Sequence, residues 1–179
     1  NDLAVGGAKP LYLSAGFILE EGFPLKDLRR IAQSMAQAAK KAGVTIACAD
    51  TKVVEHGKGD GVFINTSGIG VIEHDNSLLQ TPQPGDNIII NGYIGDHGTA
   101  IISQRENLSF TTAIESDSAP LHQLTQQMLR AAPTIRCMRD ATRGGVATVL
   151  NEWADYFSIG LLLHEQALPI RQAVHSACE

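Results

Sequence analysis

Hydrophobic and polar positions in the first eighty residues alternate between strand-like and helix-like patterns. Leu11–Leu19 is an apolar run that predicts a strand. After it, apolar side chains recur at helical spacing, so we expect a helix with Pro24 at its first position and Gly43 ending it. The runs Val44–Cys48, continuing to Val54, and Val62–Ile72 predict two more strands. This order predicts an α+β unit with a mixed or antiparallel sheet.

The rest of the chain predicts a second domain. Thr81–Asp86 contains two prolines and a glycine, as a linker does, so we expect domains at residues 1–80 and 87–179. Strands and helices alternate after the linker, which indicates an α/β domain. The predicted strands are Asn87–Tyr93, Ile135–Met138 and Ile159–Leu163, and the predicted helices begin near His97, at Pro120 (to about Ala131), at Thr142 and at Ile170 (to Glu179).

Composition excludes several classes of protein. Hydrophobic residues make up 44% of the chain, enough for a core. The net charge of −5 and the pI of about 5.6 argue against nucleic-acid binding, and the basic pairs Arg29-Arg30 and Lys40-Lys41 fit a solvated helix face. No apolar run is long enough to span a membrane, so we expect the cytoplasm. Cys48 and Cys137 lie in apolar runs, and we expect both to be buried.

The segment Arg139–Gly145 is the strongest candidate site. It connects a predicted strand to an amphipathic helix and contains Asp140 and Arg143. Thr142 or Asp140 could cap that helix, and two glycines would let a phosphate approach its positive end. No P-loop or dinucleotide-binding glycine motif occurs in the chain.

Three carboxylates stand among apolar or glycine neighbours: Asp2, before a predicted helical turn, Asp50, at the end of a predicted buried strand, and Asp140. If they converge, they could hold Mg²⁺, which prefers oxygen ligands. Alternatively, each is a cap or an ion-pair partner. Lys52 would share a strand face with Asp50, where it could neutralise a phosphoryl group or pair with that aspartate.

The turn Gly95–Thr99 places another candidate at the start of a helix. Asp96 could cap the helix, and His97 in its first turn could then stay neutral and act as a base. The alternative is a capped turn with a partly exposed histidine.

Taken together, these motifs resemble the HypE family of hydrogenase maturation proteins. That family belongs to the superfamily of aminoimidazole ribonucleotide synthetase, selenophosphate synthetase and thiamine monophosphate kinase. The matching segments are Asn1–Ala4, Gly7–Ser14, Gly16–Gly22, Asp50–Val54, Phe63–Thr66, Gly95–Gly98, Arg139–Gly145 and Asn151-Glu152. The chain starts without methionine and stops within a predicted helix, so we expect a central portion of such a protein, without its first strand and its C-terminal cysteine tail.

The resemblance implies a two-domain synthetase-like fold. Its N-terminal α+β domain would form half of a barrel completed by a second subunit, and its C-terminal domain would be α/β. ATP would lie between the domains. Asp2, Asp50 and Asp140 match positions for Mg²⁺ and phosphate, Thr51 belongs to the nucleotide-binding motif, and Lys52 matches the adjacent lysine. His97, Asp140 and Arg143 match family positions that we expect to take part in catalysis.

The resemblance also implies the chemistry. A carbamoyltransferase would load a carbamoyl group onto a cysteine, and ATP would activate its oxygen. Dehydration would then give a thiocyanate, the source of cyanide for a [NiFe] hydrogenase, passed on through maturation scaffold proteins. The alternatives are another ATP-using member of the superfamily (a kinase or cyclo-ligase) and a non-catalytic scaffold. Ala49 stands where the family has glycine, so a methyl group could crowd a phosphate there.

Overall fold

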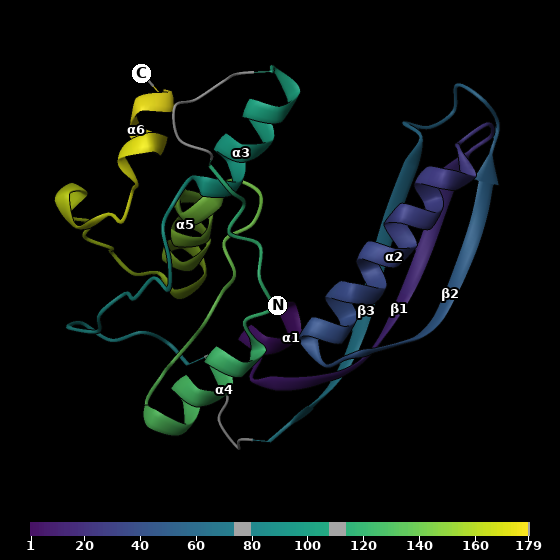
Figure 1. Cartoon of the computed structure of the whole chain (residues 1–179). Helices are drawn as coiled ribbons and strands as arrows, with labels where there is room; N and C mark the ends of the chain where they lie inside the picture. Colours follow the sequence, from purple (N-terminus) through teal and green to yellow (C-terminus); the bar gives the residue numbers. More distant parts are fainter. Residues whose placement is uncertain (74–79, 108–113, 179) are drawn as a thin grey trace. The chain divides into compact units, whose positions relative to one another are not determined.

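A computed structural model describes residues 1–73, 80–107 and 114–178 (Figure 1). The described residues divide into two compact units. Unit 1 comprises the described residues within Asn1–Leu78 and Pro120–Ile135. Unit 2 comprises the described residues within Leu79–Ala119 and Arg136–Glu179. No helix among the described residues is both long enough and apolar enough to cross a membrane.

Unit 1 is built on a three-stranded mixed sheet, as the sequence predicts. Its strands are β1 (Ala8–Glu20), β2 (Thr45–Val54) and β3 (Val62–Ile72), in the order β2-β1-β3. The central strand β1 runs parallel to β2 and antiparallel to β3. A parallel pair needs a crossover connection, and helix α2 (Leu25–Ala42) supplies it.

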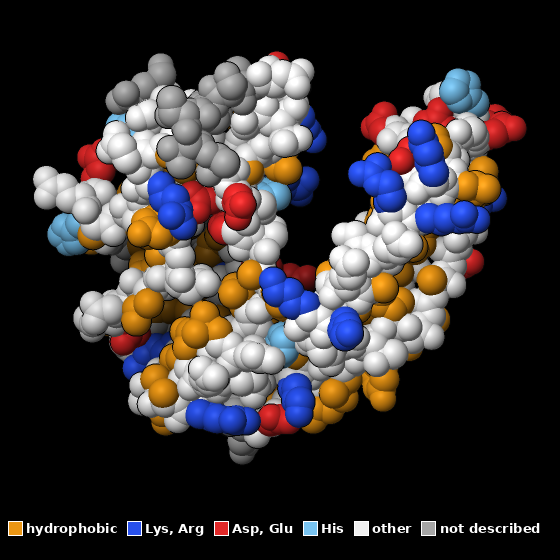
Figure 2. Space-filling view, in the orientation of Figure 1, with side chains coloured by type: hydrophobic (Ala, Val, Ile, Leu, Met, Phe, Trp, Pro, Cys, Tyr) orange, Lys and Arg blue, Asp and Glu red, His pale blue; other side chains and the backbone are white. Residues whose placement is uncertain are grey.

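Helix α2 forms where the apolar spacing predicts it. Gly43 follows its last turn in the left-handed conformation (φ +65°), which glycine adopts without strain. Pro24 has an extended backbone and lies immediately before the helix, whose first residue is Leu25. The helix therefore begins one residue later than the sequence predicts. The two basic pairs of α2 are exposed, as predicted, and Figure 2 shows Lys and Arg side chains on the surface around this helix.

The two faces of the sheet differ in what covers them. α2 lies over one face (Figure 1), where Ala15 and Leu19 of β1 are buried. The alternate positions point to the opposite face, which we call the open face. Its large apolar side chains remain between 45% and 69% exposed: Tyr12 52%, Ile18 45%, Phe63 50% and Ile69 69%.

The prediction for Cys48 is wrong. It pairs with Ser14 in the sheet and is exposed, because β2 is an edge strand with almost no buried positions. Cys137 is half-buried, and burial, followed by the charge of Asp86, raises the pKa of its thiol.

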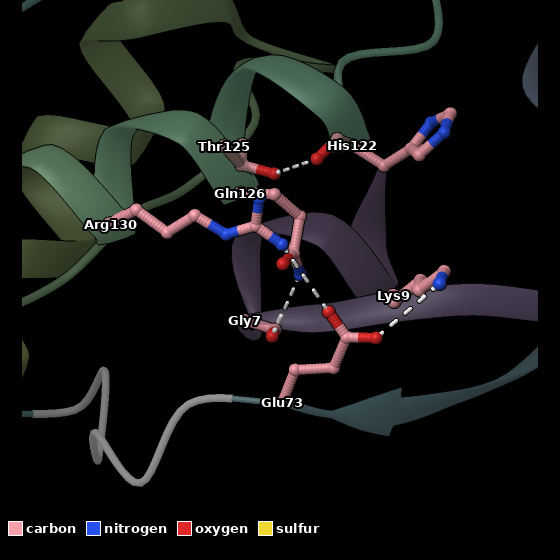
Figure 3. Close-up of polar contacts among 7 residues, drawn as sticks. All are labelled: Gly7, Lys9, Glu73, His122, Thr125, Gln126 and Arg130. Atoms are coloured by element: carbon pink, nitrogen blue, oxygen red, sulfur yellow. Dashed lines mark hydrogen bonds and ion pairs between the residues drawn. The ribbon is translucent and has the colours of Figure 1, made fainter.

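Two helices complete unit 1. The short helix α1 (Asp2–Val5) precedes β1, and α4 (His122–Ala131) packs against both of them. Figure 3 shows the polar contacts in this region: Gln126 reaches the backbone of Gly7, and Glu73 lies between Lys9 and Arg130. Residues 120–131, which the sequence pattern assigns to the second domain, thus lie in unit 1.

The described part of unit 2 contains four helical segments but not the predicted strands. They are α3 (Asp96–Arg105), α5 (Gly145–Phe157), the short 3-10 helix η1 (Glu165–Ala167) and α6 (Gln172–Cys178). Glu179, the last residue of the predicted C-terminal helix, lies outside the described residues.

The segments predicted as strands, Asn87–Tyr93, Ile135–Met138 and Ile159–Leu163, all lie within the described residues, and none of them forms a strand of a sheet. The one bridge with both partners identified there joins Ile94 to Ile170. A segment of residues that favour β structure forms a strand only when the backbone of a neighbouring segment pairs with it through hydrogen bonds. Ile89 and Leu162, both 80% exposed, show how little covers two of these segments.

Candidate functional site

The open face of the sheet in unit 1 carries two of the predicted site residues. Asp50 pairs with Gly16 of β1, and Lys52 pairs with Ile18. Paired positions in a sheet point to the same face, so both side chains lie on the open face, as the alternation predicts. The strand continues past Asp50 to Val54, as predicted, but Asp50 is exposed, so the expectation of a buried carboxylate at this position is wrong.

A glycine lies at the centre of this group. On its other side, Gly16 pairs with Asn65 of β3, which places Asp50, Gly16 and Asn65 in one row across the sheet. A Cβ at Gly16 would have no non-neighbouring atom closer than the Asn65 backbone oxygen, at 3.9 Å. The row is therefore open between the two polar side chains.

Sequence reasoning did not single out Asn65. The signal that could have found it is its residue type, because asparagine is depleted in strand interiors. Asp50 is likewise a residue type that is depleted in strands, and it occupies the same row of the sheet on β2.

Thr51 lies next to Asp50 but faces the other way. It pairs with Phe17, a position on the face that α2 covers. Its backbone N–H donates to Asp50 Oδ1 at 2.8 Å. Thr51 thus orients the Asp50 carboxylate through its backbone, while its side chain lies on the opposite face.

Asp2 is the first residue of α1, also in unit 1. Its carboxylate is exposed, and within the described residues it has no hydrogen bond or ion pair. A carboxylate held on a packed helix without a protein partner is available to a ligand.

In unit 2, the turn before α5 differs from the prediction. The helix begins at Gly145, three residues after the predicted start, and neither Thr142 nor Asp140 caps it. The preceding residue, Gly144, is left-handed (φ +80°), which turns the backbone sharply into the helix.

Charged residues of this turn fall into two groups. Arg139 is bound to Glu152 of α5 at 2.8 Å, which fixes the turn to the helix. Asp140 is half-buried and Arg143 is exposed, and neither forms an ion pair with another residue in the described parts of the chain. These two side chains remain available for chemistry.

His97 lies in the first turn of α3. Its Nδ1 is 2.9 Å from Ser116 Oγ, and the same hydroxyl oxygen accepts the Ser118 N–H at 3.2 Å. The ring is exposed. The contact at Nδ1 orients the imidazole, and in the tautomer whose Nδ1–H donates to Ser116 Oγ, Nε2 is the nitrogen that can accept a proton.

Asp96 does not cap α3, contrary to the prediction. It is only 5% exposed, and its Oδ2 accepts Arg171 Nε at 2.9 Å. The Arg171 guanidinium also lies 4.1 Å from the centre of the Tyr93 ring. A buried carboxylate requires a partner, so Asp96 uses its charge to join α3 to the segment before α6.

The metal hypothesis concerns both units. Asp2 and Asp50 belong to unit 1, and Asp140 belongs to unit 2. Within residues 1–73, 80–107 and 114–178, no three His, Cys, Asp or Glu side chains form a group that could hold a metal ion. The shared Mg²⁺ ligation by the three aspartates stays a prediction.

Comparison with protein families accounts for most of the chain. The N-terminal domain model of AIR synthase related proteins matches residues 1–72, and the C-terminal domain model of the same family matches residues 83–179. The chain belongs to the AIR synthase related family. The α+β fold with a mixed sheet, predicted from the sequence, is confirmed.

Within this family the chain is similar to HypE proteins, as the sequence motifs predict. It is 56% identical over 180 residues to the carbamoyl dehydratase HypE of Azotobacter vinelandii. That alignment covers 100% of this chain and 53% of the relative. The chain therefore spans about half the length of the curated relatives it matches.

Two solved HypE structures have the same fold. One is hydrogenase maturation protein HypE in complex with ATP, with a TM-score of 0.94 and 46% identity over 99% of this chain and 53% of that one. The other is a HypE–HypF complex, with a TM-score of 0.93 and 50% identity over 99% of this chain and 59% of that one.

Proposed function

We propose that the chain is the part of a carbamoyl dehydratase that holds ATP and the groups acting on it. The reaction is the ATP-dependent dehydration of a protein-bound S-carbamoyl group to a thiocyanate, which supplies cyanide to a [NiFe] hydrogenase. The observation that carries the proposal is the similarity to the ATP-bound HypE structure over 99% of the chain.

Three carboxylates that form no ion pair among the described residues fit Mg²⁺, which takes oxygen ligands and retains sites for nucleotide phosphates. Asp2 and Asp50 of unit 1 and Asp140 of unit 2 are the residues that would hold it. Bound there, the ion would neutralise charge on the transferring phosphoryl group.

The carbamoyl oxygen attacks the γ-phosphorus of ATP, ADP leaves, and the nitrogen gives up one proton. The carbon–oxygen bond then breaks, inorganic phosphate leaves with the oxygen, and the nitrogen loses its second proton to give S–C≡N.

The chain's own side chains supply charge and a base. Lys52, exposed on the open face, would neutralise the phosphoryl oxygens, because it has no anionic partner among the described residues. His97 would accept an amide proton at Nε2, in the tautomer whose Nδ1–H donates to Ser116 Oγ. Arg143 would stabilise the departing phosphate.

We propose a homodimer in which a second copy covers the open face. That face exposes two cross-strand apolar pairs, Tyr12 with Ile69 and Ile18 with Phe63, on either side of the Gly16–Asn65 row. Exposed apolar pairs on one sheet face are typical of a surface that a partner covers. A carbamoyltransferase is the proposed donor partner, supported by the HypE–HypF complex, and hydrogenase maturation scaffold proteins are the proposed acceptors. A cytoplasmic location stays a prediction.

Mass spectrometry of the full-length protein tests the activity. After incubation with the carbamoyl donor, the protein should gain a carbamoyl group, and adding ATP should remove one water from it. A carbamoylated protein that hydrolyses ATP without losing water would favour another ATP-using activity of the superfamily. No ATP hydrolysis at all would favour a non-catalytic scaffold.

A further inference from the structure

Helix α1 carries Asp2 but is only four residues long. A helix of this length is not stable by itself, because few of its hydrogen bonds are internal. The position of the Asp2 backbone therefore depends on what α1 packs against, and in unit 1 its helical neighbour is α4.

α4 contacts both ends of α1. Before the helix, Asn1 Oδ1 accepts the Leu121 N–H at 3.0 Å. Asparagine at this position normally caps its own helix, but this side chain makes no such bond. After the helix, Gln126 Nε2 donates to the carbonyl oxygen of Gly7 at 3.4 Å (Figure 3).

The two helices are in contact, and each also buries an apolar side chain. Ala4 of α1 is 1% exposed, and Leu129 of α4 is 2% exposed. Because both ends and the middle of α1 are fixed, the helix has little freedom to turn about its axis. The Asp2 side chain projects from this fixed element into solvent.

Gln126 is not explained by stability alone. It is 8% exposed, and its Oε1 has no hydrogen-bond partner among the described residues. A buried acceptor without a donor disfavours folding, and an apolar side chain of similar length would avoid this cost. The Gln126 side-chain amide is nevertheless present, and its Nε2 donates to the backbone that follows α1.

We propose that Gln126 is a positioning residue that holds α1 so that the Asp2 carboxylate is oriented toward a divalent cation. This inference rests on the assignment of Asp2 to the metal in the proposed function. Gln126 acts through the Gly7 carbonyl and the α1 backbone, and it does not touch the ligand itself.

The test compares four variants of the full-length protein: Gln126→Met, which keeps the length but removes the donor, Asp2→Asn, their combination, and Gln127→Met as a control. Gln127 is the exposed neighbour of Gln126 on the same helix. The first readout is Mn²⁺ affinity, measured by EPR with a non-hydrolysable ATP analogue. The second is hydrogen exchange of the Val5, Gly6 and Gly7 amides without metal.

Gln126→Met should weaken Mn²⁺ binding about tenfold, a typical effect of removing an outer support of a metal ligand. It should also speed exchange at the three amides, while Gln127→Met changes neither. In the Asp2→Asn background, Gln126→Met should cause no further loss of Mn²⁺ affinity.

Two results would overturn the inference. If Asp2→Asn weakens Mn²⁺ binding and Gln126→Met does not, Asp2 binds metal but Gln126 does not position it. If Asp2→Asn has no effect, the metal assignment itself is wrong and the inference is lost with it. Should Gln126→Met fail to fold, Asn1→Ala, which changes an exposed side chain at the other end of α1, replaces it with the same expected direction.

Discussion

At the scale of residues, polar side chains in strand interiors mark the site of unit 1. Asp50 and Lys52 could be found in the sequence because they interrupt an apolar run, and their shared face follows from the alternation of a strand. Their exposure could not be predicted, because it depends on β2 being an edge strand. Asn65 was missed because its relation to Asp50 exists only through the register with β1.

Replacing Asp50 with asparagine tests its role in the proposed function. In the full-length protein, Asp50→Asn should abolish ATP hydrolysis, because the amide lacks the negative charge that a metal ion requires. The fold should persist, since the carboxylate is exposed and its hydrogen bond to the Thr51 N–H can be made by an amide oxygen. Asp60→Asn, in the exposed turn between β2 and β3, is the control. Normal turnover in Asp50→Asn would exclude this residue from the site.

Glu20 makes a different contribution, to the stability of unit 1. Its Oε1 accepts the Gly57 N–H at 2.6 Å and its Oε2 accepts the Gly61 N–H at 3.1 Å. The Gly57 bond first and the Gly61 bond second lower the pKa of Glu20 below its ordinary value of 4.5, with a smaller contribution from His56. The carboxylate thereby holds the turn that connects β2 to β3.

The direction of the Glu20 pKa shift determines how the stability of unit 1 depends on pH. A lowered pKa in the folded state means that the stabilisation is complete above the unfolded-state pKa and is lost as the pH falls through the folded-state value. Glu20→Gln should therefore be less stable than wild type at about pH 6, and the difference should shrink below about pH 4. Urea unfolding at both pH values measures it. An equal difference at both would show that the charge of Glu20 is not involved.

At the scale of elements, hydrophobic periodicity correctly predicts the helices and strands that pack together within the first part of the chain. The first strands and α2 match their predicted bounds within a few residues, because each packs within one continuous stretch. The strands predicted in unit 2 did not form, although their residues favour β structure. A strand requires a neighbour at hydrogen-bonding distance, and the composition of a segment does not reveal whether one is present.

The start of α5 depends on a glycine. Gly144 has φ +80°, and a Cβ there would overlap the side chain of Thr148. Gly144→Ala should therefore destabilise unit 2 by about 1–3 kcal/mol, since a left-handed alanine is strained and Thr148 must move.

Gly98→Ala is the matched control. Gly98 lies within helix α3, and a Cβ there would meet nothing within 4 Å. Alanine at this position should stabilise the helix by up to about 1 kcal/mol, because glycine is a poor helix former. Thermal unfolding of the two variants should shift in opposite directions, and a shift in the same direction would contradict this account of Gly144.

At the scale of the whole molecule, the open face tests the proposed homodimer. Ile69→Asp places a charge where 69% of an isoleucine is exposed. If a second copy covers this face, the substitution should convert the full-length dimer to a monomer, measured by light scattering after size-exclusion chromatography. Leu25→Asp, at a residue 70% exposed at the start of α2, is the control and should remain dimeric. A dimeric Ile69→Asp protein would place the subunit contact elsewhere.

Unit 1 is assembled from two stretches of chain that are separated by part of unit 2. During synthesis the three strands emerge long before α4, so Ala4 and the end of α1 stay uncovered until about residue 131 has left the ribosome. A truncated protein ending at the predicted linker would lack α4 for the same reason. We expect such a truncation to expose the surface where α4 packs, and to behave as a folding intermediate rather than as an independent domain.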